Sequence, residues 1–208
     1  MPGSAPSLFT ILLAGGRSRR TGELLGPKGL VELRGVPFLL RQVQALRTLG
    51  LMPVVVTGFH HEAYAGALAG AAARIVRNPD PDRGPFSSLQ CGLELCLKDR
   101  GFSGGLFVLP LDVPVPSGRV FEILREGGGG THAAIPTHQG RGGHPVWLPR
   151  PIAENLLAVA DGPDARLDRQ LSAWAGRGAV RRLAVPDGDV LLDLNTEGAW
   201  RAYLDLHD

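Results

Sequence analysis

One stretch decides the fold expected for this chain: Ile11-Leu12-Leu13-Ala14-Gly15-Gly16-Arg17-Ser18-Arg19-Arg20-Thr21-Gly22, with Lys28 shortly after it. Its apolar first part predicts a β-strand that ends in paired glycines. Glycines let the backbone approach a ligand closely and expose N–H groups to an anion, and the arginines and lysine add positive charge. We therefore expect a strand that opens into an anion-binding loop, with nucleotide phosphates as the first candidate ligand.

Two well-known phosphate loops are excluded by the spacing of the glycines. A Walker A loop requires G-x-x-x-x-G-K-S/T, whereas here Pro27 precedes the lysine and Gly29 follows it. The Rossmann fingerprint G-x-G-x-x-G also fails, because Gly15 and Gly16 are adjacent. A surface turn with solvated arginines remains the alternative for this loop.

Length and charge favour one α/β domain that binds a small molecule. The chain has 208 residues, 44% of them hydrophobic, so it can bury a large core, and we expect a single domain over residues 1–208. The formal net charge of +2 predicts neither a nucleic acid nor a membrane surface as a partner.

The cysteines and the first residues indicate a cytoplasmic protein. Cys91 and Cys96 lie on a predicted helix, about 140° apart around its axis, so we expect buried thiols instead of a disulfide. Residues 1–8 lack the features of a secretory signal, and no apolar run reaches the roughly 18 residues of a membrane span.

Strand-like and helix-like segments alternate along the chain. We expect helices over 38–49, 62–73, 87–97, 117–125, 151–159, 165–175 and 197–206. We expect strands over 53–58 and 74–77, within 105–114, and over 133–136, 180–185 and 190–194, with a glycine turn at 127–130. Such βα units predict a three-layer αβα fold, Rossmann-like, with a mostly parallel sheet.

Polar residues at the ends of these elements are the candidate site. Asp112 ends a continuous apolar run, which suits a central parallel strand, and open α/β sheets bind ligands at the carboxyl ends of strands. We expect it to bind Mg²⁺; the alternative is an N-cap for the next helix. Ser87 and Ser88 are either helix caps or ligand contacts, Thr196 is expected to be a cap, and His144 is either structural or a contact to an acceptor substrate.

These groups suit nucleotidyl transfer. A G-x-S-x-G setting is absent around Ser18, Ser87 and Ser88, so a hydrolase nucleophile is not indicated at these serines. If the attacking group is a substrate phosphate, it is already anionic at neutral pH and needs no protein base. Catalysis then reduces to positioning and charge stabilisation.

The ordered motifs resemble those of the MobA-like molybdenum cofactor nucleotidyltransferases over about residues 8–204. The matching segments are the loop from Leu13 to Gly22 with Lys28, Asn78-Pro79, Gly84-Pro85 with Ser88-Leu89, Leu111-Asp112-Val113-Pro114, Gly143-His144-Pro145-Val146 and Asp193-Leu194-Asn195-Thr196. The acceptor in this family is the terminal phosphate of a pterin cofactor, molybdopterin. The resemblance implies that this phosphate attacks the α-phosphorus of GTP or CTP and releases pyrophosphate, and that the product passes to a molybdoenzyme or its chaperone.

The same resemblance implies a role for each matching residue. The residues implied to contact the nucleotide are Leu13, Ala14, Gly15, Gly16, Arg20, Lys28, Thr57, Asn78 and Ser88. Arg20 and Lys28 would contact its phosphates, and Arg20, Lys28 and Asp112 would be catalytic. Asp112 would bind Mg²⁺, and Asp193 or Asn195 would assist the metal or the acceptor.

The motifs do not agree on the base. The pairs Gly15-Gly16 and Gly84-Pro85 look like the guanylyl branch, whereas Asn78-Pro79 and Gly143-His144-Pro145-Val146 look more like the cytidylyl branch. We favour GTP, because the first loop lies closest to the base, and CTP is the alternative. Thr21 replaces the usual methionine of the loop, and the spacing to Lys28 is longer than usual. A sugar-phosphate nucleotidyltransferase and a non-catalytic module that delivers the cofactor are the other hypotheses.

Overall fold

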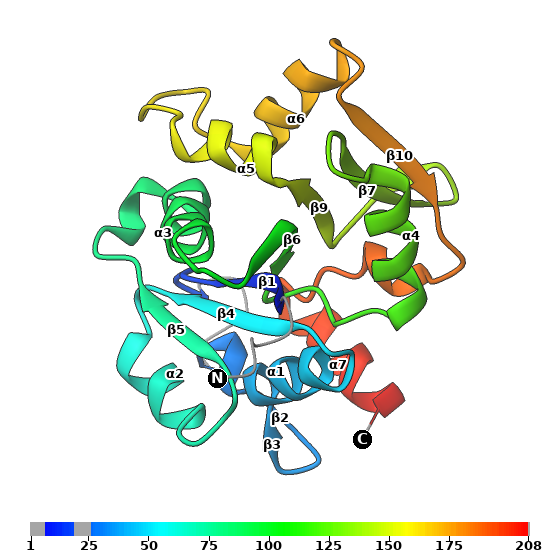
Figure 1. Ribbon diagram of the computed structural model, residues 1–208. Coiled ribbons are helices and arrows are strands. Elements are labelled where there is room, and N and C mark those ends of the chain that lie inside the picture. The colour runs from blue at the N-terminus through cyan, green and yellow to red at the C-terminus, as the bar shows by residue number, and fades with distance from the viewer. Residues whose placement is uncertain (1–6, 19–25, 208) are drawn as a thin grey trace, which may run out of the picture.

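A central β-sheet organises the protein, whose structure is a computed structural model that describes residues 7–18 and 26–207 (Figure 1). Within these residues the sheet has eight strands in the order β10-β7-β9-β6-β1-β4-β5, with β8 paired to β7. The strands are β1 Ser7–Ala14, β4 Met52–Thr57, β5 Arg74–Arg77, β6 Phe102–Pro110, β7 Ala133–His138, β8 Arg141–Gly142, β9 Val146–Pro149 and β10 Val180–Ala184. A separate small hairpin joins β2 Glu32–Leu33 to β3 Val36–Pro37.

The sheet is mostly parallel, as the βα pattern predicts. Strands β5, β4, β1 and β6 are all parallel to one another, with Leu12 in register with Val55 on one side and Leu109 on the other. Strand β9 runs antiparallel between β6 and β7, and β10 is parallel to β7. The carboxyl ends of β1, β4 and β6 therefore meet at one edge of the molecule.

Helices cover both faces of the sheet, which gives three layers (Figure 1). One face is covered by α3 Pro85–Leu97, α5 Arg150–Leu157 and α6 Leu167–Ala175. The other is covered by α1 Phe38–Thr48, α2 His61–Ala67, α4 Gly118–Gly128 and α7 Glu197–His207. This arrangement confirms the predicted αβα fold class.

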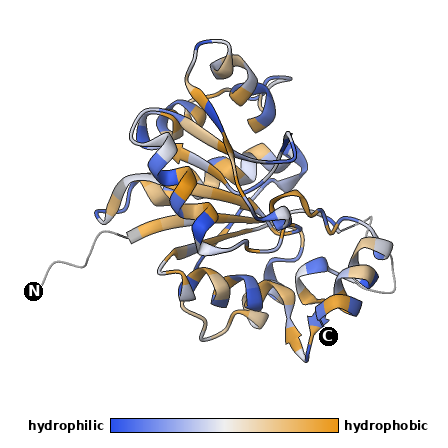
Figure 2. Cartoon of the chain, turned by 90° about the vertical axis from the view of Figure 1, so that its right-hand side faces the viewer, coloured by the Kyte–Doolittle hydropathy of each residue, from blue (hydrophilic) through white to orange (hydrophobic). Residues whose placement is uncertain are grey.

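The continuous apolar runs follow from this coverage, because successive residues of a strand face opposite layers. Ile11 packs on the layer that contains α3, and its neighbour Leu12 packs on the layer that contains α1; neither is exposed to solvent. Figure 2 shows the hydrophobic colour concentrated along the central strands. Both free thiols lie on α3, where Cys96 is fully buried and Cys91 partly buried. Burial raises the pKa of Cys96 to about 12.

Three element boundaries differ from the expectation. The helix predicted over 62–73 ends at Ala67, and the chain turns at Gly70, whose φ of 79° a helix cannot accommodate. Gly127 and Gly128 belong to α4 and not to the turn: a Cβ on Gly128 would lie 2.4 Å from the Trp147 ring, so the glycine lets the helix approach the sheet.

The third difference concerns the segment predicted as a strand over 190–194. It begins as the 3-10 helix η4, Gly188–Leu191, because the Asp187 side chain accepts a hydrogen bond from the Asp189 amide and starts a turn there. The other 3-10 helices in the described part of the chain are η2 Lys28–Leu30 and η3 Pro81–Arg83. Within the described residues, no helix has the length and apolar character needed to cross a bilayer.

Candidate active site

A cavity of about 850 Å³ opens at the carboxyl ends of β1 and β6. It is lined by the segment after β1, by the first turn of α3, by the turn after β6 and by residues 190–195. We call it the first cavity. Its position agrees with the rule that open α/β sheets bind ligands at the carboxyl ends of their strands.

The backbone at Gly15, which lines the first cavity, is closely packed against its neighbours. A Cβ on Gly15 would lie 2.6 Å from the Ser88 hydroxyl oxygen, and one on Gly58 would lie 2.6 Å from the Gly15 carbonyl oxygen. Gly16 is exposed and has nothing within 4 Å of a Cβ position. Gly15 and Gly16 line the cavity together with Leu13 and Ala14, as expected for a loop that binds phosphates.

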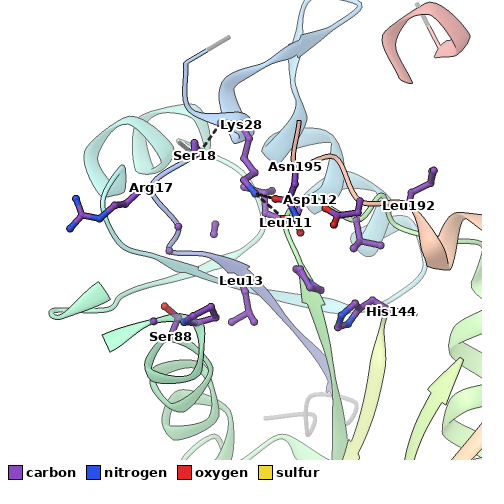
Figure 3. A pocket seen from close by; sticks show the side chains of 18 of the residues that line it. Leu13, Arg17, Ser18, Lys28, Ser88, Leu111, Asp112, His144, Leu192 and Asn195 are labelled. Carbon is purple, nitrogen blue, oxygen red and sulfur yellow. Dashed lines mark hydrogen bonds and ion pairs between the residues drawn. The ribbon is translucent and has the colours of Figure 1, made fainter. Parts of the chain in front are cut away.

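The charged centre of the cavity joins three segments that are far apart in the sequence. The Lys28 ammonium donates to Asp112 Oδ2 at 2.8 Å and to Asn195 Oδ1 at 2.9 Å (Figure 3). The side chains of Lys28 and Asp112 are only 15% and 16% exposed. Partial burial strengthens the Coulomb attraction between the two charges relative to a pair on the surface.

Hydrogen bonds of the backbone position Asp112. The Leu111 amide donates to the Leu13 carbonyl oxygen at 3.1 Å, and the Leu194 amide donates to the Asp112 carbonyl oxygen at 2.8 Å. Because Leu194 is hydrogen-bonded to Asp112, its neighbours Asp193 and Asn195 lie near Asp112. Asp193 and Asn195 both line the first cavity. Because the Asp112 carboxylate faces Lys28, it is not the N-cap of α4, which begins only at Gly118.

These oxygen donors suit a hard divalent cation. A positive charge, the Lys28 ammonium, is already held between the Asp112 and Asn195 oxygens. Among the described residues, no cluster of three His, Cys, Asp or Glu side chains is placed to hold a metal by itself. An ion bound at Asp112 would therefore complete its coordination with substrate phosphates or water.

Two of the residues predicted to bind the nucleotide lie behind the cavity wall. The Thr57 hydroxyl is fully buried, 2.7 Å from His61 Nδ1 and 3.2 Å from the Val76 carbonyl oxygen. The Asn78 amide is also buried and donates to the hydroxyl oxygens of Ser87 and Ser88, at 2.9 and 3.0 Å. Neither Thr57 nor Asn78 is among the residues that line the first cavity.

Ser88, by contrast, lines the first cavity. Neither serine caps α3: the helix begins after Gly84 with no side-chain cap, and the Ser87 hydroxyl donates to the Gly84 carbonyl oxygen at 2.8 Å. Thr196 is a helix cap, as predicted, because its hydroxyl oxygen accepts from the Ala199 amide at 3.2 Å. Asn78 therefore supports the cavity wall from behind, whereas Ser88 lies at the surface of the cavity.

The basic loop is described only in part. Arg20, with its neighbours from residue 19 to residue 25, lies outside the described residues. Arg17 points away from Lys28 and Asp112 (Figure 3), with its guanidinium 3.7 Å from the centre of the Phe59 ring and ion-paired with Asp82. Sequence reasoning missed Phe59 and Asp82; an aromatic residue directly after a strand-ending glycine is the signal that it overlooked.

His144 lines the first cavity at the side opposite Ser18 (Figure 3). Its backbone amide donates to the Val190 carbonyl oxygen at 2.9 Å, and a Cβ on Gly143 would lie 2.0 Å from that oxygen, so glycine is required there. His144 Nδ1 is buried without a hydrogen-bond partner among the described residues. Burial lowers the pKa of His144 against the opposing effect of Asp112, so the imidazole is neutral at pH 7.

A second cavity of about 690 Å³ adjoins the first. It lies between α6 and the sheet and is lined largely by apolar side chains, including Leu89, Val146 and Leu171, with Arg166 and Arg182 as its cations. Leu13, Pro110 and His144 line both cavities. One elongated ligand, or two reacting ligands, can therefore extend across the shared wall.

The fold agrees with the family that sequence comparison assigns to the chain. Residues 10–177 match the MobA-like NTP transferase domain, and the chain belongs to that family. It is 33% identical over 135 residues to a protein of Pseudomonas aeruginosa strain PAO1 named molybdenum cofactor guanylyltransferase, and this match spans 64% of the chain and 63% of the relative. A protein of Burkholderia orbicola strain MC0-3 with the same name is 31% identical over 184 residues, which are 85% of the chain and 86% of the relative.

Solved structures show the same fold. A nucleotidyl transferase from Methanothermobacter thermautotroptrophicus superposes with a TM-score of 0.81 at 22% identity, over 97% of both chains. Rv0371c of Mycobacterium tuberculosis H37Rv, solved as a complex with manganese, superposes with a TM-score of 0.71 at 23% identity, over 96% of this chain and 98% of that one.

Proposed function

We propose that the protein transfers GMP from GTP to the terminal phosphate of molybdopterin, with Mg²⁺, and releases pyrophosphate. The observation that carries the proposal is the Lys28 ammonium held between Asp112 and Asn195, beside a glycine loop at the ends of the central strands. Membership of the MobA-like family supports nucleotidyl transfer. The names of the relatives support GTP as the donor over CTP.

We assign the donor nucleotide to the first cavity. The main chain from Leu13 to Gly16 and the Ser88 hydroxyl would contact the nucleotide. Lys28 would leave Asp112 and bind the nucleotide phosphates, and Arg20 would bind these phosphates too. Asp112 and Asn195, with Asp193 next to them, would hold the Mg²⁺, which when bound would neutralise charge on the triphosphate. An oxygen of the acceptor phosphate forms the new bond to the α-phosphorus, and the bond to the β-phosphate oxygen breaks. No protein base is needed, because the attacking oxygen is already anionic.

We assign the acceptor to the second cavity. Its apolar walls suit the faces of a flat ring system, and Arg182 suits a phosphate, whereas Arg166 is paired with Asp168. The neutral imidazole of His144 lies where the two cavities meet and would contact the acceptor there. This arrangement would direct the acceptor phosphate toward the nucleotide.

We further infer that residues 1–208 act as one domain in the cytoplasm and pass the product to a molybdoenzyme or its chaperone. The near-neutral net charge supports a small-molecule substrate over a nucleic acid.

The test is pyrophosphate release with Mg²⁺ and molybdopterin, run in parallel with GTP, CTP, ATP and UTP. We expect release with GTP alone. Release with CTP alone would correct the base and keep the reaction. Turnover of a hexose phosphate with none of molybdopterin would overturn the acceptor, and nucleotide binding without release in any mixture would indicate a non-catalytic module.

A further inference from the structure

The Tyr64 side chain on α2 lines the first cavity, and its hydroxyl contacts the backbone of η2. The side chain is 1% exposed and belongs to the apolar layer beneath the sheet, yet it lines the cavity. Its hydroxyl oxygen accepts a hydrogen bond from the Gly29 amide at 3.2 Å. It is also hydrogen-bonded to the Ser18 hydroxyl.

These contacts join two parts of the chain that are ten residues apart. The Lys28 amide donates to the Ser18 hydroxyl oxygen at 3.2 Å, beside the bond from Gly29 to Tyr64. Ser18 follows β1, whereas Lys28 and Gly29 begin η2. Holding such points together costs conformational entropy, which these hydrogen bonds offset.

The Tyr64 ring also packs close to the Gly29 backbone, next to the residue that precedes Asp112. A Cβ on Gly29 would lie 2.8 Å from the ring and 3.2 Å from a methyl group of Leu111. The ring and the side chain of the residue before Asp112 therefore both lie close to the Gly29 backbone, on the side where a Cβ would project. Burial raises the pKa of Tyr64, so its hydroxyl stays protonated at neutral pH.

The geometry points to Tyr64 as a positioning residue: its hydroxyl holds the Lys28–Gly29 backbone so that the Lys28 ammonium meets Asp112 and the triphosphate. This inference rests on the proposed role of Lys28 at the nucleotide. It adds a residue that touches neither reacting phosphate and acts only through Lys28.

The test is Tyr64→Phe, which removes the hydroxyl and keeps the ring. We expect turnover to fall about tenfold, the effect of roughly one hydrogen bond, while the KM for the acceptor stays the same. In a Lys28→Met background, the same substitution should change turnover less than twofold, because the group it positions is gone. A tenfold loss that persists in that background would overturn the inference.

The chain contains a matched control, because Tyr203 is its only other tyrosine and packs away from the site, against Phe38 and Trp200. Tyr203→Phe should leave turnover within twofold of the wild type. Amide exchange of Gly29, measured by NMR without nucleotide, should be about tenfold faster in Tyr64→Phe and unchanged in Tyr203→Phe. Unchanged exchange in Tyr64→Phe would overturn the role of Tyr64, whereas a wild type inactive with every nucleotide would overturn the proposed function.

Discussion

The two cavities share a wall and differ in chemistry. The first is built where the central strands end, from glycine main chain and the charged group of Lys28, Asp112 and Asn195. The second lies over the face of the sheet beneath α6 and is built from side chains such as Leu89 and Leu171. The difference teaches that strand ends supply polar main chain and charge, while a sheet face supplies shape and apolar surface. Substitutions in each cavity should therefore affect different substrates.

The largest effect is expected for Asp112→Ala. Removing the proposed metal ligand should lower turnover about 1000-fold, the scale of several kcal/mol of lost charge stabilisation, as measured by pyrophosphate release. The fold should survive, because the side chain faces the cavity and not the core. Asp99→Ala is the control, since Asp99 forms a partly buried ion pair with Arg74 away from either cavity. Equal turnover in Asp112→Ala and the wild type would remove Asp112 from the metal site.

Lys28→Met should follow, with a loss of roughly 2–4 kcal/mol of transition-state stabilisation, or about 30- to 1000-fold in rate. The protein has one other lysine, Lys98, which pairs with Glu94 on the surface, so Lys98→Met is the matched control. Without nucleotide, Lys28→Met should bind Mn²⁺ more tightly than the wild type, because the ammonium no longer occupies Asp112. A rate within twofold of the wild type would show that Lys28 does not contact the triphosphate.

Filling the second cavity should affect the acceptor alone. Ser172 lines this cavity on α6, whereas its exposed neighbour Ala173 does not. Ser172→Trp should raise the KM for the acceptor about tenfold, the scale of lost apolar contact, and leave the KM for GTP unchanged. Ala173→Trp should change neither constant. A raised KM for GTP in Ser172→Trp would mean that the nucleotide, and not the acceptor, extends into the second cavity.

The smallest effect concerns the wall between the cavities. Burial holds the pKa of His144 below its ordinary value of 6.5. The unfolded chain therefore binds more protons at this residue once the pH falls below about 6.5, and the folded state loses stability there. Between about pH 8 and pH 5.5, urea unfolding should show a larger loss for the wild type than for His144→Gln. If the free energy of unfolding falls equally with pH in the two proteins, burial does not disfavour a charged His144 imidazole.

Much of the first cavity could be predicted from local sequence. The strand that ends in Gly15 and Gly16, and the aspartate that ends the β6 run, are recognisable because backbone conformation and strand burial depend on neighbouring residues. Family motifs then associated Lys28 and Asp112 with one site. The partners of these residues were harder to predict: Asn195 is 167 positions from the lysine it contacts. Thr57 and Asn78 are close in sequence to residues that line the cavity. Their side chains bond buried groups behind the cavity wall, and the sequence does not show this direction.

The sequence by itself determined the αβα layers, the mostly parallel sheet and the glycine loop at the end of β1, since these depend on periodicity and on residues close together in the chain. Only the tertiary structure decided that Tyr64 meets Gly29, that Lys28 is held between Asp112 and Asn195, and that an apolar cavity adjoins the polar one. These features depend on how helices pack across the sheet. That packing is set by the whole core, and no local pattern in the sequence encodes it.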